Sequence, residues 1–566
     1  MKRCPKCQRE YTDEALNFCL DDGAWLREGS ESDEPATAIL HSTGTPGNTP
    51  PRVIDHHTTE RPKYPTNSES PAAGSARSKK MYWALAPLGV AIILASVFGY
   101  RYFSSGSTDQ INSIAVLPFE NGSGDANLDY LSDGLSESLI DKLSQLPQLK
   151  VIARNSSFKY RGANVDISDA ANKLGVRAIV MGKIMRVGDN LSVRVEMIDA
   201  QENRQLWSEQ YNRKQSDLLS IQQEITQTAS EKLRLKLSGA QEQQLTKRET
   251  VNPQAYELLL KGRYYNSKGG TDNEKKAVEY LEQAVAVDPN YALAHAELSM
   301  RYINLAANSL ADPKVYTPKA ESAARKALEL DENLADAHLA ISRIYVARWQ
   351  WHEAETERKR AIELDPNNAQ THSRYAQLLS LLGRHDEAIA EAKRAKELDP
   401  LAPLIAQTLG YRLHHARRYD EAIAELKKVL ESDPNLDYVY YILGYAYAGK
   451  GQFKEAVAAY QEAIRLGDKS PSTQIYLGAA YAQAGERGKA QEILKQLQST
   501  KEYVSPGELA ILYGALGDKE AAFQSLEKAY AEHDLQLQFL KVDPAFDPLR
   551  DDPRYTDLIR RVGLPQ

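Results

Sequence analysis

Apolar and polar positions alternate with a fixed period over the second half of the chain. Alanine, a large apolar residue and a small residue each return every 34 positions. The three series are Ala354, Ala388, Ala422, Ala456 and Ala490; Tyr345, Leu379, Leu413, Tyr447 and Tyr481; and Ser342, Ala376, Gly410, Gly444 and Gly478. Several series in phase indicate an internal repeat. Each unit reads as two amphipathic helices, ended by an Asp-Pro pair because the residue before proline disfavours helix.

This repeat resembles the tetratricopeptide family. Its small first-helix residue and second-helix alanine allow the two backbones to approach closely. One helix pair cannot bury its apolar face alone, so we expect stacked pairs to form an all-α superhelix. The rhythm covers residues 255–534, about eight helix pairs, with extra residues around 309–318 between the helices of one pair. Residues 535–566 depart from the repeat, and we expect a polar terminal cap or tail there.

A different pattern precedes the repeats, in residues 111–240. Strand-like apolar runs and amphipathic helical stretches alternate there, which predicts a compact α/β domain. The predicted strands are 113–119, 150–154, 176–186, 191–199 and 205–211, and the predicted helices are 128–146, 167–174 and 217–237.

The sequence of this domain is similar to the TolB amino-terminal-like domain, also called the FlgO-type domain. Three stretches carry the resemblance: IAVLPFENGSGDANLDYLSDGLSESLIDKLSQLPQLKVIAR, LGVRAIVMGKI and IDAQENRQLWSEQY. In that family, tetratricopeptide repeats often follow, and a membrane span often joins the domain to a cytoplasmic cyclase, kinase or DNA-binding domain. Residues 1–80 contain neither a kinase glycine loop nor cyclase aspartates. The resemblance therefore implies a bacterial envelope protein that is not an enzyme.

Residues 81–100 form an uncharged apolar run with aromatic residues at both ends. Twenty helical residues span about 30 Å, the thickness of the hydrocarbon core, so we predict a single transmembrane helix at 81–103. Five basic residues precede it, whereas only Arg101 follows before Lys142. Because basic flanks stay inside, the amino terminus is expected in the cytoplasm. The expected location is the bacterial inner membrane, with the later domains periplasmic or otherwise extracytoplasmic.

All three cysteines lie within residues 1–27. Cys4, Cys7 and Cys19, followed by Asp22, have a spacing similar to a zinc ribbon, in which thiolates and a carboxylate can hold one structural zinc ion. Asp21 is an alternative fourth ligand, and a degenerate ribbon without metal is an alternative to the whole site. Residues 28–80 are rich in Ser, Thr, Pro and Gly, which predicts a disordered linker.

The remaining composition argues against several functions. The net charge of -7, with signs mixed, gives no reason to expect nucleic acid as a partner. No catalytic arrangement is legible, and Gly122 and Gly124 lack the rest of a phosphate loop. We therefore predict a membrane-anchored, non-enzymatic scaffold whose repeats bind a protein or peptide. The alternative is a transmembrane signalling or regulatory component that links an envelope partner to a cytoplasmic effector through the ribbon.

In the tetratricopeptide family the ligand lies in a concave groove lined by the first helices. The groove positions correspond here to Arg343, Gln377, Gln407, Tyr411, His414, Tyr438, Tyr441 and Tyr445. Tyrosines and amides suit an extended peptide, because they offer aromatic area together with donors and acceptors. Tyr438, Tyr441 and Tyr445 have a second interpretation, in which they only fill the gap between repeats.

Overall fold

The computed structural model describes residues 2–3, 10–11, 27–28, 111–162, 164–247, 249–307 and 313–565. The chain divides into two compact units, Met1–Arg101 and Tyr102–Gln566. In the first, strands β1 (Lys2–Arg3), β2 (Glu10–Tyr11) and β3 (Arg27–Glu28) form an antiparallel sheet in the order β2-β1-β3. The predicted zinc ligands, the predicted span 81–103 and all but residue 28 of the predicted linker lie outside the described residues. Among the residues that are described, no helix has the length and apolar character needed to cross a membrane.

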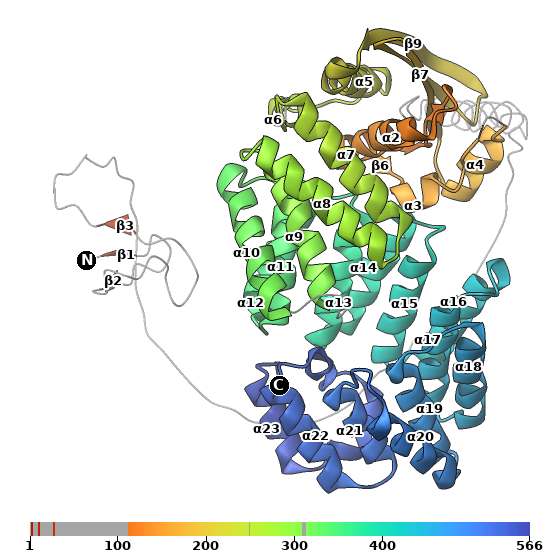
Figure 1. The fold of residues 1–566 in the computed structure, drawn as a ribbon, viewed down its shortest axis with the longest axis vertical. Coiled ribbons are helices and arrows are strands. Elements are labelled where there is room, and N and C mark those ends of the chain that lie inside the picture. The colour runs from red at the N-terminus through yellow and green to blue at the C-terminus, as the bar shows by residue number, and fades with distance from the viewer. Residues whose placement is uncertain are drawn as a thin grey trace, which may run out of the picture. The chain divides into compact units, whose positions relative to one another are not determined.

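The second unit begins with an α/β domain (Figure 1). Its strands are β4 (Ser113–Val116), β5 (Glu120–Asn121), β6 (Lys150–Val151), β7 (Ala178–Val187), β8 (Asn190–Asp199) and β9 (Arg204–Lys214). Its α-helices are α2 (Asp129–Ser144), α3 (Arg154–Ser157), α4 (Ile167–Leu174), α5 (Leu218–Lys232) and α6 (Gly239–Thr246). The strand order is β6-β4-β7-β8-β9, with β5 also pairing with β7. Strand β4 is parallel to β6 and β7, whereas β7, β8 and β9 form an antiparallel meander.

The apolar run of β4 explains its central position in this sheet. Successive side chains of a strand point to opposite faces. Ile114 and Val116 join the apolar cluster that contains the leucines of α2, whereas Ala115 joins the cluster that contains Leu174 of α4. Both faces are therefore covered by helices, and β4 has no polar side.

Three predicted elements of this domain differ from the structure. The predicted strand 113–119 ends at Val116. The predicted strand 150–154 ends at Val151, and Arg154 begins a short helix. The Ala153 N–H donates to the Leu398 carbonyl at 2.8 Å, so the chain leaves the sheet to bond with the repeats. The predicted helix 217–237 ends at Lys232 and is followed, after a turn, by α6.

The rest of the unit is a superhelix of antiparallel helix pairs. Among the described residues the pairs are α7 (Pro253–Lys268) with α8 (Thr271–Val287), α9 (Ala292–Ala307) with α10 (Pro313–Leu330), α11 (Ala335–Ala347) with α12 (Trp351–Leu364), α13 (Ala369–Leu381) with α14 (His385–Leu398), α15 (Pro403–His415) with α16 (Tyr419–Ser432), α17 (Asp437–Gly449) with α18 (Phe453–Leu466), α19 (Pro471–Gln483) with α20 (Arg487–Ser499), and α21 (Pro506–Ala515) with α22 (Lys519–Ala531). The predicted insertion at 309–318 is shorter than expected, because α10 begins at Pro313 and contains Pro318.

Complementary volumes hold the two helices of a pair together. The alanine series at 354–490 is fully buried. A Cβ on Gly410 would lie 2.8 Å from Leu426, and a Cβ on Gly444 would lie 2.5 Å from the ring of Tyr460. Leu426 and Tyr460 occupy the same repeat position, 34 residues apart. Glycine therefore stands where the facing side chain is large, which keeps the helix spacing constant along the array.

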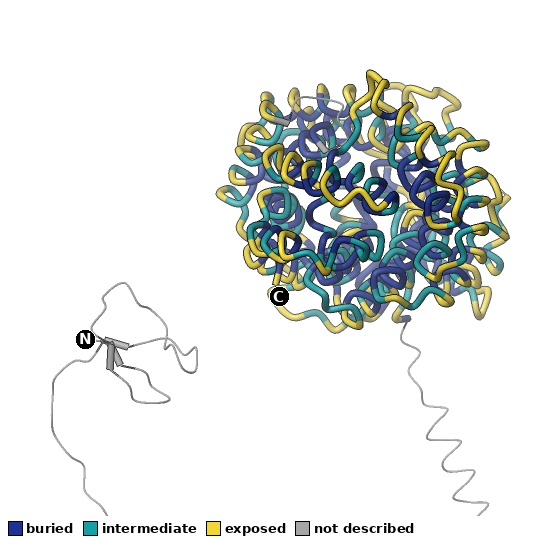
Figure 2. Tube along the Cα trace, turned by 90° about the horizontal axis from the view of Figure 1, so that it is seen from below, coloured by how far each residue is buried: buried dark blue, intermediate teal, exposed yellow. Residues whose placement is uncertain are grey.

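The carboxyl-terminal tail corrects the expectation of a polar cap. It contains the 3-10 helices η3 (Leu535–Phe539) and η4 (Pro544–Leu549) and helix α23 (Pro553–Arg561). Aspartates cap these short elements, and the apolar residues between them are buried: Leu537, Leu540, Val542, Phe546, Leu549, Tyr555, Leu558, Val562 and Leu564. In Figure 2, dark blue buried stretches run through the interior of the helical layers, and exposed yellow ones follow the outer turns. The tail thus adds an apolar core rather than a solvated end.

This tail also returns to much earlier repeats. The Trp351 indole N–H donates to the Val562 carbonyl at 3.1 Å. Lys541 Nζ donates to the Leu382 carbonyl at 3.2 Å, and the Arg417 guanidinium forms two hydrogen bonds of 2.8 Å with Asp547. These contacts hold the tail against the loops of the third, fourth and fifth helix pairs.

The α/β domain is held by inter-repeat turns on other parts of the array. The buried Asn367 amide, in the turn between α12 and α13, donates to the carbonyls of Ser144, Leu146 and Leu149 at 2.8–3.0 Å. Asp399, in the turn after α14, accepts from Asn155 and Ser156. The Asp-Pro turns that end second helices therefore also bind the domain.

Candidate binding sites

Five of the eight predicted groove residues line one cavity of about 340 Å³: Gln377, Gln407, Tyr411, Tyr441 and Tyr445. They lie on α13, α15 and α17, the first helices of three successive pairs. Gln377, Tyr411 and Tyr445 stand at the same repeat position, so stacking places them in a row. The structure brings these five residues together, as the groove hypothesis requires; their role in binding stays a prediction.

The other walls of this cavity were not foreseen. Arg374 and Arg412 come from the same first helices, Glu508 from α21, and Phe539 and Asp543 from the tail. Burial raises the pKa of Glu508 to about 7 and that of Asp543 to about 6. The tail residues have no repeat period, so no sequence signal linked them to the groove.

Three predicted groove residues lie elsewhere. Arg343 donates to Asn304 at 2.7 Å, which directs its guanidinium toward the preceding first helix, α9. His414 is buried against the Tyr419 and Tyr445 rings, and burial lowers its pKa to about 3. Tyr438, in the first turn of α17, packs against an apolar cluster. None of the three lines the cavity. Arg343 shares the repeat position of Gln377 and Tyr411 but lies on α11, one helix pair before the helices that line it.

The cavity tyrosines also pack against one another. The Tyr441 hydroxyl lies 3.1 Å from the Tyr445 hydroxyl, and the Tyr445 and Tyr476 rings have centroids 4.1 Å apart. Tyr445 is buried, whereas Tyr441 is partly buried and contacts the rings of Tyr460 and Tyr476. Filling the space between repeats and lining the cavity are thus two roles of the same side chains.

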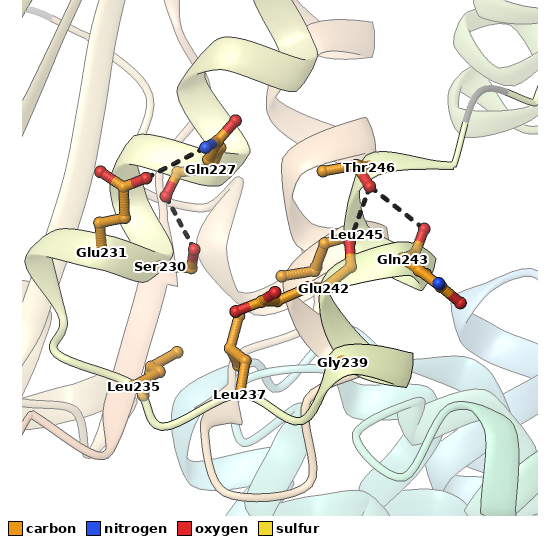
Figure 3. A pocket seen from close by; sticks show the side chains of 10 residues that line it. All are labelled: Gln227, Ser230, Glu231, Leu235, Leu237, Gly239, Glu242, Gln243, Leu245 and Thr246. Carbon is orange, nitrogen blue, oxygen red and sulfur yellow. Dashed lines mark hydrogen bonds between the residues drawn. The ribbon is translucent and has the colours of Figure 1, made fainter.

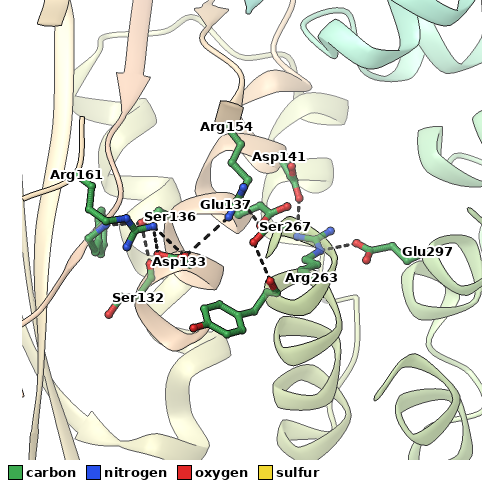
Figure 4. Close-up of polar contacts among 12 residues, drawn as sticks. Ser132, Asp133, Ser136, Glu137, Asp141, Arg154, Arg161, Arg263, Ser267 and Glu297 are labelled. Carbon is green, nitrogen blue, oxygen red and sulfur yellow. Dashed lines mark hydrogen bonds and ion pairs between the residues drawn. The ribbon is translucent and has the colours of Figure 1, made fainter. Parts of the chain in front are cut away.

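A second cavity, of about 180 Å³, lies between α2 and the first helix pairs. Arg263 of α7 is its buried cation: its Nη1 lies 2.7 Å from Asp141 Oδ2, and its Nε pairs with Glu297 (Figure 4). Asp336 and Asp365 line the same space, and one oxygen of Asp365 has no partner among the described residues. No group of three or more residues there, or elsewhere in the described parts, has a geometry that could hold a metal ion.

The acidic residues of this cavity make the contact between α2 and the first helix pairs sensitive to pH. Burial, with repulsion from Asp141 and Glu297, raises the pKa of Asp336 to about 8, and burial raises the pKa of Asp365 to about 6. Since the folded pKa exceeds the ordinary value near 4, the folded state retains protons that the unfolded state releases. We therefore expect the melting temperature to fall as the pH rises from about 5 to about 8.

Asp336→Asn should flatten this dependence, because an amide of the same shape does not titrate. Melting curves of the wild type and the variant at a series of pH values measure it. Asp552 is a suitable control, since its pKa is lowered to about 2, so Asp552→Asn should leave the slope above pH 5 unchanged. Equal slopes for wild type and Asp336→Asn would contradict the prediction.

A third cavity, of about 530 Å³, lies between α5 and α6 (Figure 3). Its polar groups bond within the same segment: Gln227 donates to Glu231, Ser230 to the Gln227 carbonyl, and Thr246 to the Glu242 carbonyl. No buried polar side-chain atom of its lining, within the described residues, lacks a partner. We assign no ligand to it.

Comparison with family models assigns the repeats. Two tetratricopeptide repeat models match residues 409–471 and 441–498, and 359–390. The chain therefore contains tetratricopeptide repeats, arranged as a superhelix after an α/β domain. The model of the second domain of HilA/YgeH-like transcriptional regulators matches residues 109–228. The similarity to the TolB amino-terminal-like domain stays a prediction.

Known proteins resemble parts of the chain. A protein of Rhizobium meliloti (strain 1021) named "Putative adenylate cyclase 3" is 39% identical over 188 residues, which are 33% of this chain and 32% of that protein. The chain thus spans about a third of that relative's length. A tetratricopeptide repeat protein from Parabacteroides merdae is 13% identical with a TM-score of 0.36, covering 47% of this chain and 99% of the other. PilF of Pseudomonas aeruginosa is 23% identical with a TM-score of 0.29, covering 36% and 92%.

Proposed function

We propose that this protein is a membrane-anchored, non-enzymatic interaction scaffold whose repeats bind a protein or peptide outside the cytoplasm. Tetratricopeptide repeats are a protein–protein interaction fold, which supports the general function. The cavity on the first-helix face of α13, α15 and α17 is the observation that carries the proposal, because its tyrosines and amides suit a peptide backbone.

Site-directed photo-crosslinking tests this function. A photoreactive residue at Gln377, on the cavity wall, should give a discrete protein or peptide adduct in cells. The same residue at Glu431, exposed on the second helix α16, is the matched control and should give none. Adducts of equal yield at both positions, or at neither, would count against the cavity as the binding surface.

The proposed anchor is the apolar run 81–103, with the amino terminus in the cytoplasm. The basis is the excess of Lys and Arg before the run. Protease added to intact spheroplasts should digest residues 104–566 and spare an epitope placed at residue 1. Protection of the repeats until the membrane is permeabilised would reverse this topology.

We also propose one structural zinc ion bound by Cys4, Cys7, Cys19 and Asp22. A segment this short has little apolar core, so the metal would supply its folding free energy. A purified peptide of residues 1–30 should retain one zinc per chain at neutral pH. Cys19→Ser should abolish retention, and comparing Asp22→Asn with Asp21→Asn identifies the fourth ligand. A wild-type peptide without stoichiometric zinc would favour the degenerate ribbon.

A second candidate function is transmembrane regulation, with a cytoplasmic protein bound by the ribbon. The match of residues 109–228 to a domain of transcriptional regulators, and the relative named as a cyclase, favour it. Deleting residues 1–27 separates the candidates. If the protein is a scaffold, the deletion variant should keep both the crosslinked adduct at Gln377 and the phenotype of cells that carry the full-length protein. If it is a regulator, the variant should keep the adduct but lose that phenotype.

A further inference from the structure

Acidic residues outnumber basic ones in the cavity of about 180 Å³ between α2 and the first helix pairs. Most of these acids form ion pairs: Glu137 with Arg154, and Asp141 and Glu297 with Arg263. Arg301, the second cation of the lining, lies 3.5 Å from Glu274. Asp336 and Asp365 remain, and neither carboxylate forms a salt bridge within the described residues.

Asp365 has an unused oxygen inside the protein. It belongs to the Asp-Pro turn after α12, and only 7% of its surface is exposed. Its Oδ2 accepts from the Asn368 side chain at 3.1 Å, whereas its Oδ1 has no partner among the described residues. The equivalent Asp399 uses both oxygens, which accept from Asn155 and Ser156 of the α/β domain. Because a buried carboxylate oxygen without a donor is unfavourable, the free oxygen of Asp365 indicates a donor that a ligand supplies.

Two further acceptors of the lining are also unused. Asp336 lies in the first turn of α11 and makes no side-chain hydrogen bond with a described residue. The equivalent residues of later repeats carry no charge: Gln370, Leu404, Tyr438 and Ser472. Gln145, directly after α2, has an unpartnered Oε1. These three unused groups of the cavity are all acceptors, and two of them are acidic.

We propose that this cavity binds a primary ammonium group between Asp336 and Asp365. An ammonium group has three N–H donors and no acceptor, which matches two carboxylates and the Gln145 oxygen. A metal ion fits less well, because no group of three or more acidic, His or Cys residues in the described parts could hold one. The alkyl stem of the ligand lies along the apolar part of the lining, which is formed by Met300, Leu334, Ala335, Leu339 and Leu364.

The ligand joins two parts of the chain. Gln145 belongs to the α/β domain, whereas Asp336 and Asp365 belong to the repeats, so a bound ammonium group strengthens the contact between them. This site is separate from the 340 Å³ cavity, and the inference therefore goes beyond the proposed function. Protons compete with the ligand, since the pKa is about 8 for Asp336 and about 6 for Asp365. Binding should therefore be stronger near pH 8 than near pH 5.

The test uses melting curves of the full-length protein at about pH 8. Methylammonium chloride is the probe, and sodium chloride at equal ionic strength is the reference. Methylammonium should raise the melting temperature saturably, by a few degrees, because it binds the folded state alone. Tetramethylammonium has the same charge without N–H donors and should act as sodium does. Near pH 5 the methylammonium effect should disappear, because both aspartates are then protonated.

Two variants locate the effect. Asp336→Asn should melt at the same or a higher temperature than the wild type at this pH and lose the methylammonium effect. Asp433→Asn is the matched control, because Asp433 has the turn position of Asp365 two repeats later, is exposed and does not line the cavity. This control should keep the effect.

The proposal is overturned if methylammonium acts only as sodium does, if tetramethylammonium acts equally, or if Asp336→Asn keeps the effect. An Asp336→Asn variant that does not fold would also contradict it, because a carboxylate without a partner should not be needed for folding. Two larger probes identify the source of the ammonium group. If Nα-acetyl-lysine amide acts as methylammonium does, the site accepts a lysine side chain, and if only butylammonium does, the ligand is a free amine.

Discussion

Asn367→Asp is expected to detach the α/β domain from the repeats. The wild-type amide donates to three carbonyls at and after the end of α2, where a helix leaves its last C=O groups without partners. An aspartate carboxylate at this position has only acceptor oxygens, which cannot hydrogen-bond to the three carbonyl oxygens. Losing these bonds and placing a charge against the carbonyls should cost about 3 kcal/mol or more, even with Arg394 nearby.

Hydrogen exchange and calorimetry check this result. Amides of α2 and β6 should exchange faster, and the melting curve should separate into two transitions. Asn435→Asp is the control, because Asn435 occupies the same turn position two repeats later, is exposed, and its backbone N–H donates within its own turn, to Asp433. If Asn367→Asp behaved like Asn435→Asp, the turn would not be holding the domain.

Gly444→Ala should destabilise the array itself. The added Cβ would lie 2.5–2.7 Å from three ring atoms of Tyr460, which is fully buried and cannot swing away. Overpacking of this kind costs typically 1–3 kcal/mol, and we expect the upper end because the obstacle is a rigid ring. Denaturant unfolding should show a lower midpoint.

Gly488→Ala makes the same chemical change where space is free, since outside its own helical turn no atom of the described residues lies within 4 Å of the added Cβ. Alanine is the better helix former, so this variant should be unchanged or slightly more stable. Equal stability of the two variants would mean that α17 and α18 lie farther apart than described.

The sequence predicted most of the structural features that depend on the repeat period or on regular apolar spacing. The places of Ala422, Gly444 and Tyr411 follow from their positions within the repeat, because equivalent positions of stacked repeats lie on the same face of the array. The helix pairs and the strands of the α/β domain follow from local apolar spacing. His414 was assigned to the groove because it is close in sequence to Tyr411. Its sequence position did not reveal that its ring packs into the core.

Contacts between distant segments were not predictable in this way. Arg412 breaks the apolar pattern of its position, which was a usable signal, but its neighbours Glu508 and Asp543 come from other parts of the chain. The tail reads as polar because Asp and Pro are frequent, although those residues cap and turn while the apolar ones between them are buried. Only the three-dimensional arrangement joins these segments to the groove.

The returning tail also affects how the array folds. In an open stack of repeats, each unit contacts only its neighbours, so folding can spread from any point and either end can fray alone. Here the bond between Trp351 and Val562 joins residues 211 positions apart. Such a contact requires a large loop to close, which slows folding and links the unfolding of distant repeats. During synthesis, the repeats from α12 onward emerge before the tail. The apolar surface that the tail covers therefore stays exposed to solvent until the tail has been made. Residues 535–565 therefore convert a linear stack into a closed cooperative unit.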